Sequence, residues 1–214
     1  GRDRYIEYIS WLANVAASCE KILQEVRNLQ RSELREAGEG FDIKKQVGSS
    51  TMAHKKNPIK SENACGLARI VRAMIIPTYE NALLWHERDL ANSSSERFTL
   101  SHASALCEDV LAKTRDVLTN MWVDAERCLQ NIKSQKGLVM AEKVMIDLVD
   151  HGIPRDEAHE ILRAASFEAV DKNIELIDVC SRTPEIVAAF SAEELEAMFE
   201  PANHIGVAGE IVDE

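Results

Sequence analysis

One long stretch without proline or glycine predicts a long helix. It runs from Tyr5 to Arg35 and reads YIEYISWLANVAASCEKILQEVRNLQRSELR. Ile22, Val26 and Leu29 lie on one stripe at the spacing of a helix face, and apolar side chains extend well beyond that stripe. At ~1.5 Å per residue, such a helix would be roughly 46 Å long. A long helix that is apolar on several sides is typical of the centre of a helical bundle.

Further helical patterns follow this stretch. Gly38 and Gly40 are expected to end the first helix. A kink or break is expected at Pro77, because proline lacks the N–H of the helix ladder. The expected segments are a long loop at about 37–58 and helices at about 61–86 and 95–122.

Shorter helices with more frequent turns are expected after Trp122. Thr183 followed by Pro184 predicts a helix start with proline at its first position. Ser191 and Glu194 have the spacing of a capping box. Another helix is expected at about 155–173, after a turn that contains a glycine and a proline.

These patterns predict an all-α fold, and no stretch predicts a strand. We place a domain boundary near Asp124, where the punctuation becomes denser. Residues 1–124 would then contribute long central helices to a bundle, and residues 125–214 would form a smaller C-terminal helical domain. A composition with 45% hydrophobic and only 5% aromatic residues favours helix formers in the same way.

The charge and the cysteines exclude several classes of protein. A net charge of −11 argues against generic binding to nucleic acid, which needs a basic surface. The five cysteines are odd in number, widely spaced and without a CxxC pair, so neither a disulfide framework nor a zinc site is expected. We find no signal peptide and no membrane span. These features indicate reduced thiols in a cytoplasmic protein without a metal or another cofactor.

A basic loop with two serines is the first candidate for chemistry. It runs from Val47 to Pro58 and reads VGSSTMAHKKNP. Within 42–60, five lysines stand against one aspartate. A dense positive field and backbone N–H groups could stabilise the alkoxide of Ser49 or Ser50 and so make a base. The plain alternative is a Gly-Ser-Ser turn in a solvated lysine-rich loop. In the same loop, His54 could contact a ligand.

A second cluster combines arginines with a hydroxyl ahead of a helix. It reads WHERDLANSSSER from Trp85 to Arg97 and contains Arg88 and Ser93. Planar guanidinium groups and a helix N-terminus suit phosphate oxygens. The plain alternative is helix capping by Ser93 or Ser94 together with surface ion pairs. Those pairs would involve Glu87, Asp89 and Glu96.

Both clusters resemble one enzyme superfamily. The stretch from Gly48 to Pro58, GSSTMAHKKNP, is similar to the fumarase/aspartase signature Gly-Ser-Ser-x-Met-Pro-x-Lys-x-Asn-Pro. The second cluster resembles the adenylosuccinate lyase family in particular, as do RNLQR at 27–31 and PANHIG at 201–206. Ala53 departs from the signature, where a proline is usual, and this puts the rigidity of the loop in doubt.

The resemblance implies a reaction and a role for each matching residue. The family eliminates fumarate from adenylosuccinate, and from the succinylated carboxamide intermediate of purine synthesis, without a cofactor. Ser49 matches the general base. Asn63 and the residues at the end of the loop match groups that bind the succinyl part, and the second cluster matches the phosphate site. The implied substrate-binding residues are Ser50, Lys55, Lys56, Asn57, Asn63, Arg88, Ser93 and Arg97.

The resemblance also implies an assembly. The family forms homotetramers, and three subunits contribute to each active site. Its general-acid histidine would lie upstream of Gly1, so we expect these 214 residues alone to be inactive. Two alternatives stay open: another lyase of the superfamily, such as argininosuccinate lyase or a fumarase, and a helical assembly module without catalytic activity.

Overall fold

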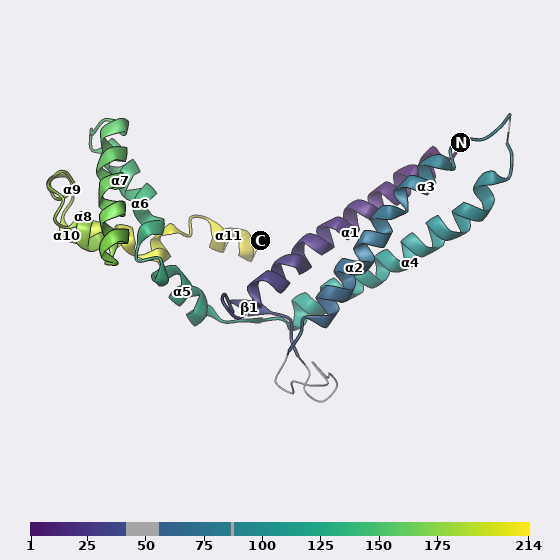
Figure 1. Cartoon of the computed structure of the whole chain (residues 1–214), viewed down its shortest axis with the longest axis horizontal. Helices are drawn as coiled ribbons and strands as arrows, with labels where there is room; N and C mark the ends of the chain where they lie inside the picture. The colour runs from purple at the N-terminus through teal and green to yellow at the C-terminus, as the bar shows by residue number, and fades with distance from the viewer. Residues whose placement is uncertain (42–55, 87) are drawn as a thin grey trace. The chain divides into compact units, whose positions relative to one another are not determined.

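The computed structural model describes residues 1–41, 56–86 and 88–214, and it divides into two compact units (Figure 1). The first unit is Gly1–Arg127 and the second is Cys128–Glu214. Helices dominate both units, so the predicted all-α fold is confirmed. No helix in the described parts of the chain is long and apolar enough to cross a membrane.

The first unit is a bundle of long helices that lie side by side (Figure 1). Leu23, Val71 and Val110 come from three different helices and are fully buried in one apolar core. Many of the remaining core residues are alanines and cysteines, whose small side chains let the helices approach closely. The helices of this unit are α1 (Asp3–Leu29), α2 (Ile59–Ala73), α3 (Ile75–Glu80) and α4 (Ala91–Asn120).

The expected end of the first helix was wrong. The helix ends at Leu29 and not near Arg35, and Gly38 and Gly40 do not cap it. The Leu29 carbonyl, which would bind the Glu33 N–H in a longer helix, instead accepts from the Glu36 N–H at 3.1 Å. Arg127 anchors the resulting turn, because its guanidinium group donates to the carbonyls of residues 33 and 34 at 2.9 and 3.0 Å. Those carbonyls serve a tertiary contact, and Arg35 turns the chain with a φ of 55°.

A minimal β-bridge was not expected from the sequence. Strand β1 (Ala37–Gly38) pairs antiparallel with β2 (Trp122–Val123), with Gly38 opposite Trp122. Two residues per strand are too few for a sequence pattern. The bridge holds the chain that follows α1 beside the end of α4.

Pro77 breaks the second helical stretch as predicted. The break lies at Met74, between α2 and α3. Proline has no N–H to donate to the carbonyl of Ala73, which is the last residue of α2. The helix predicted from residue 95 begins earlier, at Ala91, for a reason that concerns the second candidate cluster.

The second unit packs short helices around its own core. Val144, Leu148, Leu176 and Ile186 are fully buried in it. Burial raises the pKa of the Cys180 thiol to about 11, and none of the five cysteines forms a disulfide. The elements after β2 are α5 (Ala125–Ser134), α6 (Ala141–Asp150), α7 (Arg155–Lys172), α8 (Leu176–Cys180), α9 (Pro184–Ala189), α10 (Ala192–Phe199), α11 (Ala208–Asp213) and 3₁₀ turns at Leu138–Met140 and Pro201–His204.

Both predicted helix starts in this unit are confirmed. Thr183 is the N-cap of α9, with Pro184 at the first helical position. Ser191 caps α10 in a complete capping box with Glu194. Hydrogen bonds from the Ser191 backbone and hydroxyl lower the pKa of the Glu194 carboxyl.

Candidate functional site

The candidate residues fall into two groups within the first unit. Lys56 and Asn57 lie just before the start of α2 and Asn63 lies in its second turn, whereas the arginine cluster lies around the start of α4. Ser49, Ser50 and Lys55 lie outside the described residues, as do Ala53 and His54. Their roles remain predictions from the sequence.

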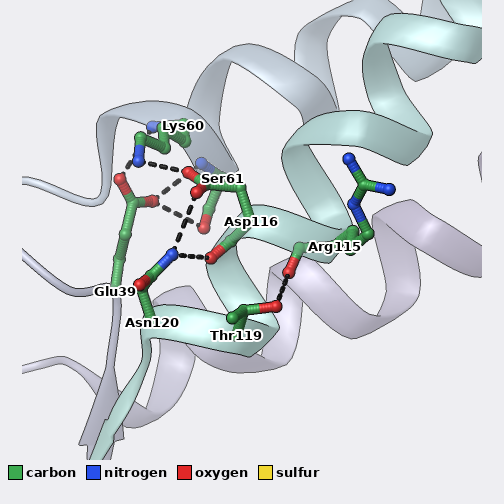
Figure 2. A network of polar contacts seen from close by, with 7 residues as sticks. All are labelled: Glu39, Lys60, Ser61, Arg115, Asp116, Thr119 and Asn120. Atoms are coloured by element: carbon green, nitrogen blue, oxygen red, sulfur yellow. Dashed lines mark hydrogen bonds and ion pairs between the residues drawn. The ribbon is translucent and has the colours of Figure 1, made fainter.

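A buried carboxylate caps the start of α2 (Figure 2). Glu39 is only 4% exposed. Its Oε1 accepts a hydrogen bond from the Lys60 backbone N–H at 3.0 Å. Its Oε2 accepts from the Ser61 N–H at 2.9 Å and from the Ser61 hydroxyl at 2.8 Å. A negative group at a helix N-terminus satisfies orphan N–H groups and interacts favourably with the helix dipole.

One glutamine connects the residues before the basic loop with the last residues of that loop. The Gln30 side-chain oxygen accepts a hydrogen bond from the Glu39 N–H at 2.9 Å, and its amide nitrogen donates to the Lys56 carbonyl at 3.0 Å. Gln30 immediately follows α1. The end of α1, the residue that caps α2 and the residues that lead into α2 are therefore connected through a single side chain.

Glycines let the chain around Glu39 pass close to its neighbours. A Cβ atom on Gly40 would lie 2.2 Å from the backbone oxygen of Asn120. A Cβ atom on Gly38 would lie 2.6 Å from the Trp122 ring. Neither position has room for a larger residue without movement of the backbone or the ring.

An ion pair fixes the same end of α2 to α4. The Lys60 ammonium group pairs with the Asp116 carboxylate (Figure 2). The Asn120 amide donates to both the backbone and the side-chain oxygen of Asp116, each at 2.9 Å. Lys60 therefore makes two separate contacts: its ammonium group pairs with Asp116 of α4, and its backbone N–H binds Glu39.

Two clefts open beside the start of α2 and share Gln30 and Lys56. One has a volume of about 590 Å³ and the other about 490 Å³. The second contains Arg27 and Arg31, which belong to the RNLQR stretch that resembles the adenylosuccinate lyase family. The first is lined by Gln30, Ser32, Arg35, Glu39, Lys56, Trp122 and Asp124. The second is lined by Gln24, Arg27, Asn28, Gln30, Arg31, Lys56, Pro58 and Glu62.

Asp89, which the plain alternative placed in surface ion pairs, caps the start of α4. Asp89 accepts hydrogen bonds from the Ala91 N–H at 2.8 Å and the Trp85 N–H at 3.0 Å. These backbone hydrogen bonds, that of Ala91 above all, lower the pKa of the Asp89 carboxyl. The alternative in which Ser93 or Ser94 caps the helix was therefore wrong, because α4 begins at Ala91, ahead of both.

The predicted phosphate ligands differ in burial but share a lack of side-chain contacts within the described part of the chain. The side chains of Arg88, Ser93 and Arg97 make no hydrogen bond or ion pair with the residues that the structure describes. Arg88 and Arg97 are exposed, and Ser93 is half-buried. The Glu96 carboxylate, which the plain alternative placed in an ion pair with the arginines of this cluster, instead forms an ion pair with Arg2 at 2.7 Å.

The two groups of candidate residues lie at opposite ends of the bundle. The Lys60–Asp116 pair marks the end at which α2 begins. Arg97 precedes Asp116 on the same straight run of α4 by roughly 28 Å, at 1.5 Å per residue. Figure 1 shows the start of α4 at the end of the bundle that carries α3 and the N-terminus. One chain therefore does not bring the two groups together around one small molecule.

The sequence did not predict the hydrogen bonds by which Gln30, Glu39 and Asp89 hold the two helix starts. Glu39 acts on residues more than twenty positions later, so no local pattern reveals it. Asp89 stands two positions before the first helical residue, which is a local capping signal that could have been used. Among the described residues, no group of three or more His, Cys, Asp or Glu is placed to hold a metal ion.

Two family models match the two ends of the chain. Residues 1–73 match a family model described as "Lyase", and residues 137–214 match one described as "Adenylosuccinate lyase C-terminus". The chain is 44% identical to the adenylosuccinate lyase of Archaeoglobus fulgidus, over 99% of its own length and 48% of that protein. It is 37% identical to the adenylosuccinate lyase of Bacillus subtilis, over 95% of its own length and 47% of that protein.

Solved structures share the fold. A 3-carboxy-cis,cis-muconate lactonizing enzyme from Pseudomonas putida is 30% identical with a TM-score of 0.85, over 100% of this chain and 46% of that chain. A fumarate lyase from Mesorhizobium is 27% identical with a TM-score of 0.86, over 99% of this chain and 46% of that chain. The helical bundle and the signature loop thus define a member of the fumarase/aspartase superfamily.

The sequence relatives narrow this class further. The chain belongs to the adenylosuccinate lyase family, and it spans about half the length of the curated relatives that it matches.

Proposed function

We propose that the protein carrying this chain is an adenylosuccinate lyase of purine biosynthesis in the cytoplasm. It eliminates fumarate from adenylosuccinate to give AMP, and from the succinylated aminoimidazole carboxamide ribotide. The single observation that carries the proposal is the 44% identity to an adenylosuccinate lyase over 99% of the chain. The solved superfamily members with other names are less similar, at 30% identity or below.

In the proposed mechanism, Ser49 removes the proton from the carbon next to a succinyl carboxylate. The carbon–nitrogen bond then breaks, the fumarate double bond forms, and the leaving nitrogen takes a proton from a donor outside this chain. Negative charge builds up on the carboxylate during proton removal, so cationic and N–H groups must surround it. Ser50, Lys55, Lys56, Asn57 and Asn63 would provide these groups.

The nucleotide phosphate would bind at the start of α4. Arg88 and Arg97 offer exposed guanidinium groups, and Ser93 adds a hydroxyl within the first turn of the helix. Because these side chains have no partner among the described residues, phosphate binding would break no contact with that part of the chain. A bidentate arginine suits phosphate better than a lysine does.

The distance between the two groups supports an active site that is shared between subunits. Roughly 28 Å along α4 is too far for one nucleotide to reach from the start of α2 to the arginine cluster. If both groups bind one substrate molecule, they must come from different subunits. The proposed homotetramer, whose active sites each combine elements of three subunits, satisfies this condition.

The decisive assay uses the full-length protein. Purified wild type incubated with adenylosuccinate should release fumarate and AMP in equal amounts. The Ser49→Ala variant should lose turnover by a factor of about 10²–10⁴, the usual contribution of a general base. Absence of fumarate release by wild type would refute the proposed activity. Equal turnover of the two proteins would refute the role of Ser49.

A further inference from the structure

Glu39 is the only residue with three hydrogen bonds to the first turn of α2 among those that the structure describes. We propose that Glu39 is a positioning residue, which holds the substrate-binding start of α2 in the geometry that elimination requires. The proposal rests on the proposed function, because it takes Lys56, Asn57 and Asn63 as substrate ligands. Glu39 itself would not touch the substrate.

The start of α2 needs a cap from elsewhere in the chain. Its N-cap residue is Pro58, whose side chain makes no capping hydrogen bond. Free N–H groups remain in the first turn of any helix, and leaving them buried without a partner is unfavourable. Glu39 satisfies the N–H groups of Lys60 and Ser61, and its charge matches the positive end of the helix dipole.

The cap also has a fixed position of its own. Gln30 accepts the Glu39 N–H, Gly40 passes against the Asn120 carbonyl, and β1 pairs with β2 just before Glu39. These contacts tie Glu39 to the end of α1 and to the end of α4. The first turn of α2 is therefore placed relative to two other helices through one carboxylate.

The predicted ligands lie beside this contact. Asn57 is three positions before Lys60, and Asn63 is two positions after Ser61. Lys56 is bound through its carbonyl to Gln30, the same residue that binds Glu39. A shift of the first turn would move all three ligands together. Displacement of about 1 Å by a remote substitution can cost on the order of 100-fold in rate.

Glu39→Gln is the sharpest substitution, because it keeps the size of the side chain and removes one acceptor. The new NH₂ group would face an N–H or hydroxyl donor in place of an oxygen. We expect kcat per folded enzyme to fall by roughly 10- to 100-fold in the full-length protein. A smaller change in KM is expected, since the ligands themselves remain.

The chain offers a matched control in its other unit. Glu194 Oε2 accepts hydrogen bonds from the Ser191 N–H at 2.8 Å and the Ser191 hydroxyl at 2.9 Å, the same chemistry that Glu39 shows with Ser61. Glu194→Gln therefore removes an equivalent capping acceptor in the unit that holds none of the candidate residues. It should leave kcat within about twofold of wild type.

Two measurements decide the proposal. The first is kcat for adenylosuccinate, and the second is hydrogen exchange of a peptide that contains the Lys60 and Ser61 amides. Lower kcat with faster exchange in Glu39→Gln, and neither in Glu194→Gln, is the expected result. Unchanged kcat in a folded Glu39→Gln enzyme would overturn the positioning role. If Glu39→Gln does not fold, Ser61→Ala removes only one of the three hydrogen bonds, and unchanged kcat and exchange in that variant would overturn it equally.

The same pair of measurements separates this inference from the proposed function. If wild type does not cleave adenylosuccinate, the proposed function fails, and the exchange measurement alone then judges the cap. Unchanged exchange in Glu39→Gln would show that Glu39 does not hold the start of α2.

Discussion

The two ends of the helical bundle that carry the candidate residues are capped in opposite ways. At the start of α4, half-buried Asp89 caps the helix from two residues away. At the start of α2, buried Glu39 caps the helix from more than twenty residues away. The first contact is local, because Asp89 binds only residues within four positions of itself. The second exists only when α1, α2 and α4 have assembled, so the geometry of that end depends on tertiary structure.

This comparison predicts that the two ends will respond differently to substitution. Changes at the start of α4 should affect substrate affinity through the phosphate. Changes around Glu39 should affect turnover and stability together. Three substitutions test this difference in order of decreasing expected effect.

Removing a phosphate ligand should have the largest effect. Arg97→Ala in the full-length protein should raise KM for adenylosuccinate by roughly 30-fold, because a hydrogen bond to a charged group contributes about 2 kcal/mol. The effect should nearly vanish for succinyladenosine, which lacks the phosphate. Steady-state kinetics with both substrates provide the measurement.

Arg115→Ala is the matched control for Arg97→Ala. Arg115 is an exposed arginine on the same helix, and Figure 2 shows its side chain pointing away from Glu39 and Ser61. Its removal should leave both KM values unchanged. An equal loss of affinity for the two substrates in Arg97→Ala would remove the phosphate assignment and favour a superfamily lyase with another substrate.

Adding one methyl group at Gly40 should disturb the tertiary cap. The new Cβ would lie 2.2 Å from the Asn120 carbonyl oxygen, so the backbone that carries Glu39 must move. Such overpacking costs about 1–3 kcal/mol, and both the melting temperature and kcat of Gly40→Ala should fall.

Gly66→Ala tests the same substitution where space is open. Gly66 lies within α2, and a Cβ there meets no atom within 4 Å. Alanine in a helix is more favourable than glycine by about 0.5–1 kcal/mol, so the melting temperature should rise slightly. A Gly40→Ala enzyme that melts as wild type does would contradict the close approach at Asn120.

The smallest effect concerns the local cap and its pH dependence. The pKa of Asp89 is lowered in the folded protein, so its contribution to stability is present above the unfolded value of 3.8 and is lost as the pH falls below it. Asp89→Asn should therefore melt at a lower temperature than wild type at neutral pH, and the difference should shrink toward about pH 3. A difference that stays constant over this range would contradict the role of the ionised carboxylate.

Local sequence signals predicted most of the secondary structure. Proline at position 77 broke a helix, Thr183 and Ser191 began helices, and long apolar stripes marked α1 and α4. The first helix was predicted too long because its last expected residues form a turn instead, in which the Glu36 N–H binds the Leu29 carbonyl and Arg127, far away in sequence, anchors the carbonyls of residues 33 and 34. Its end depends on a residue that no local pattern could connect to it.

In the candidate site, too, local motifs were recognisable from the sequence and long-range contacts were not. Short motifs identified both groups of candidate residues, and their roles remain predictions. Neither motif could reveal that the groups lie at opposite ends of one bundle, since that distance follows from the packing of α2 against α4. Glu39 was missed for a related reason, because a single glutamate between two glycines has no distinctive spacing.

If one active site combines the two ends of the bundle from different subunits, two variants that each lack one end should restore activity when they are mixed. Full-length Ser49→Ala and Arg97→Ala proteins are assayed separately, at an adenylosuccinate concentration far below KM, and then after joint unfolding and refolding. Each variant alone should be nearly inactive, and the mixture should regain activity, because some sites would receive Ser49 from one subunit and Arg97 from another. A mixture that is no more active than the two separate proteins would contradict an active site shared between subunits, since every site would then take both residues from the same chain.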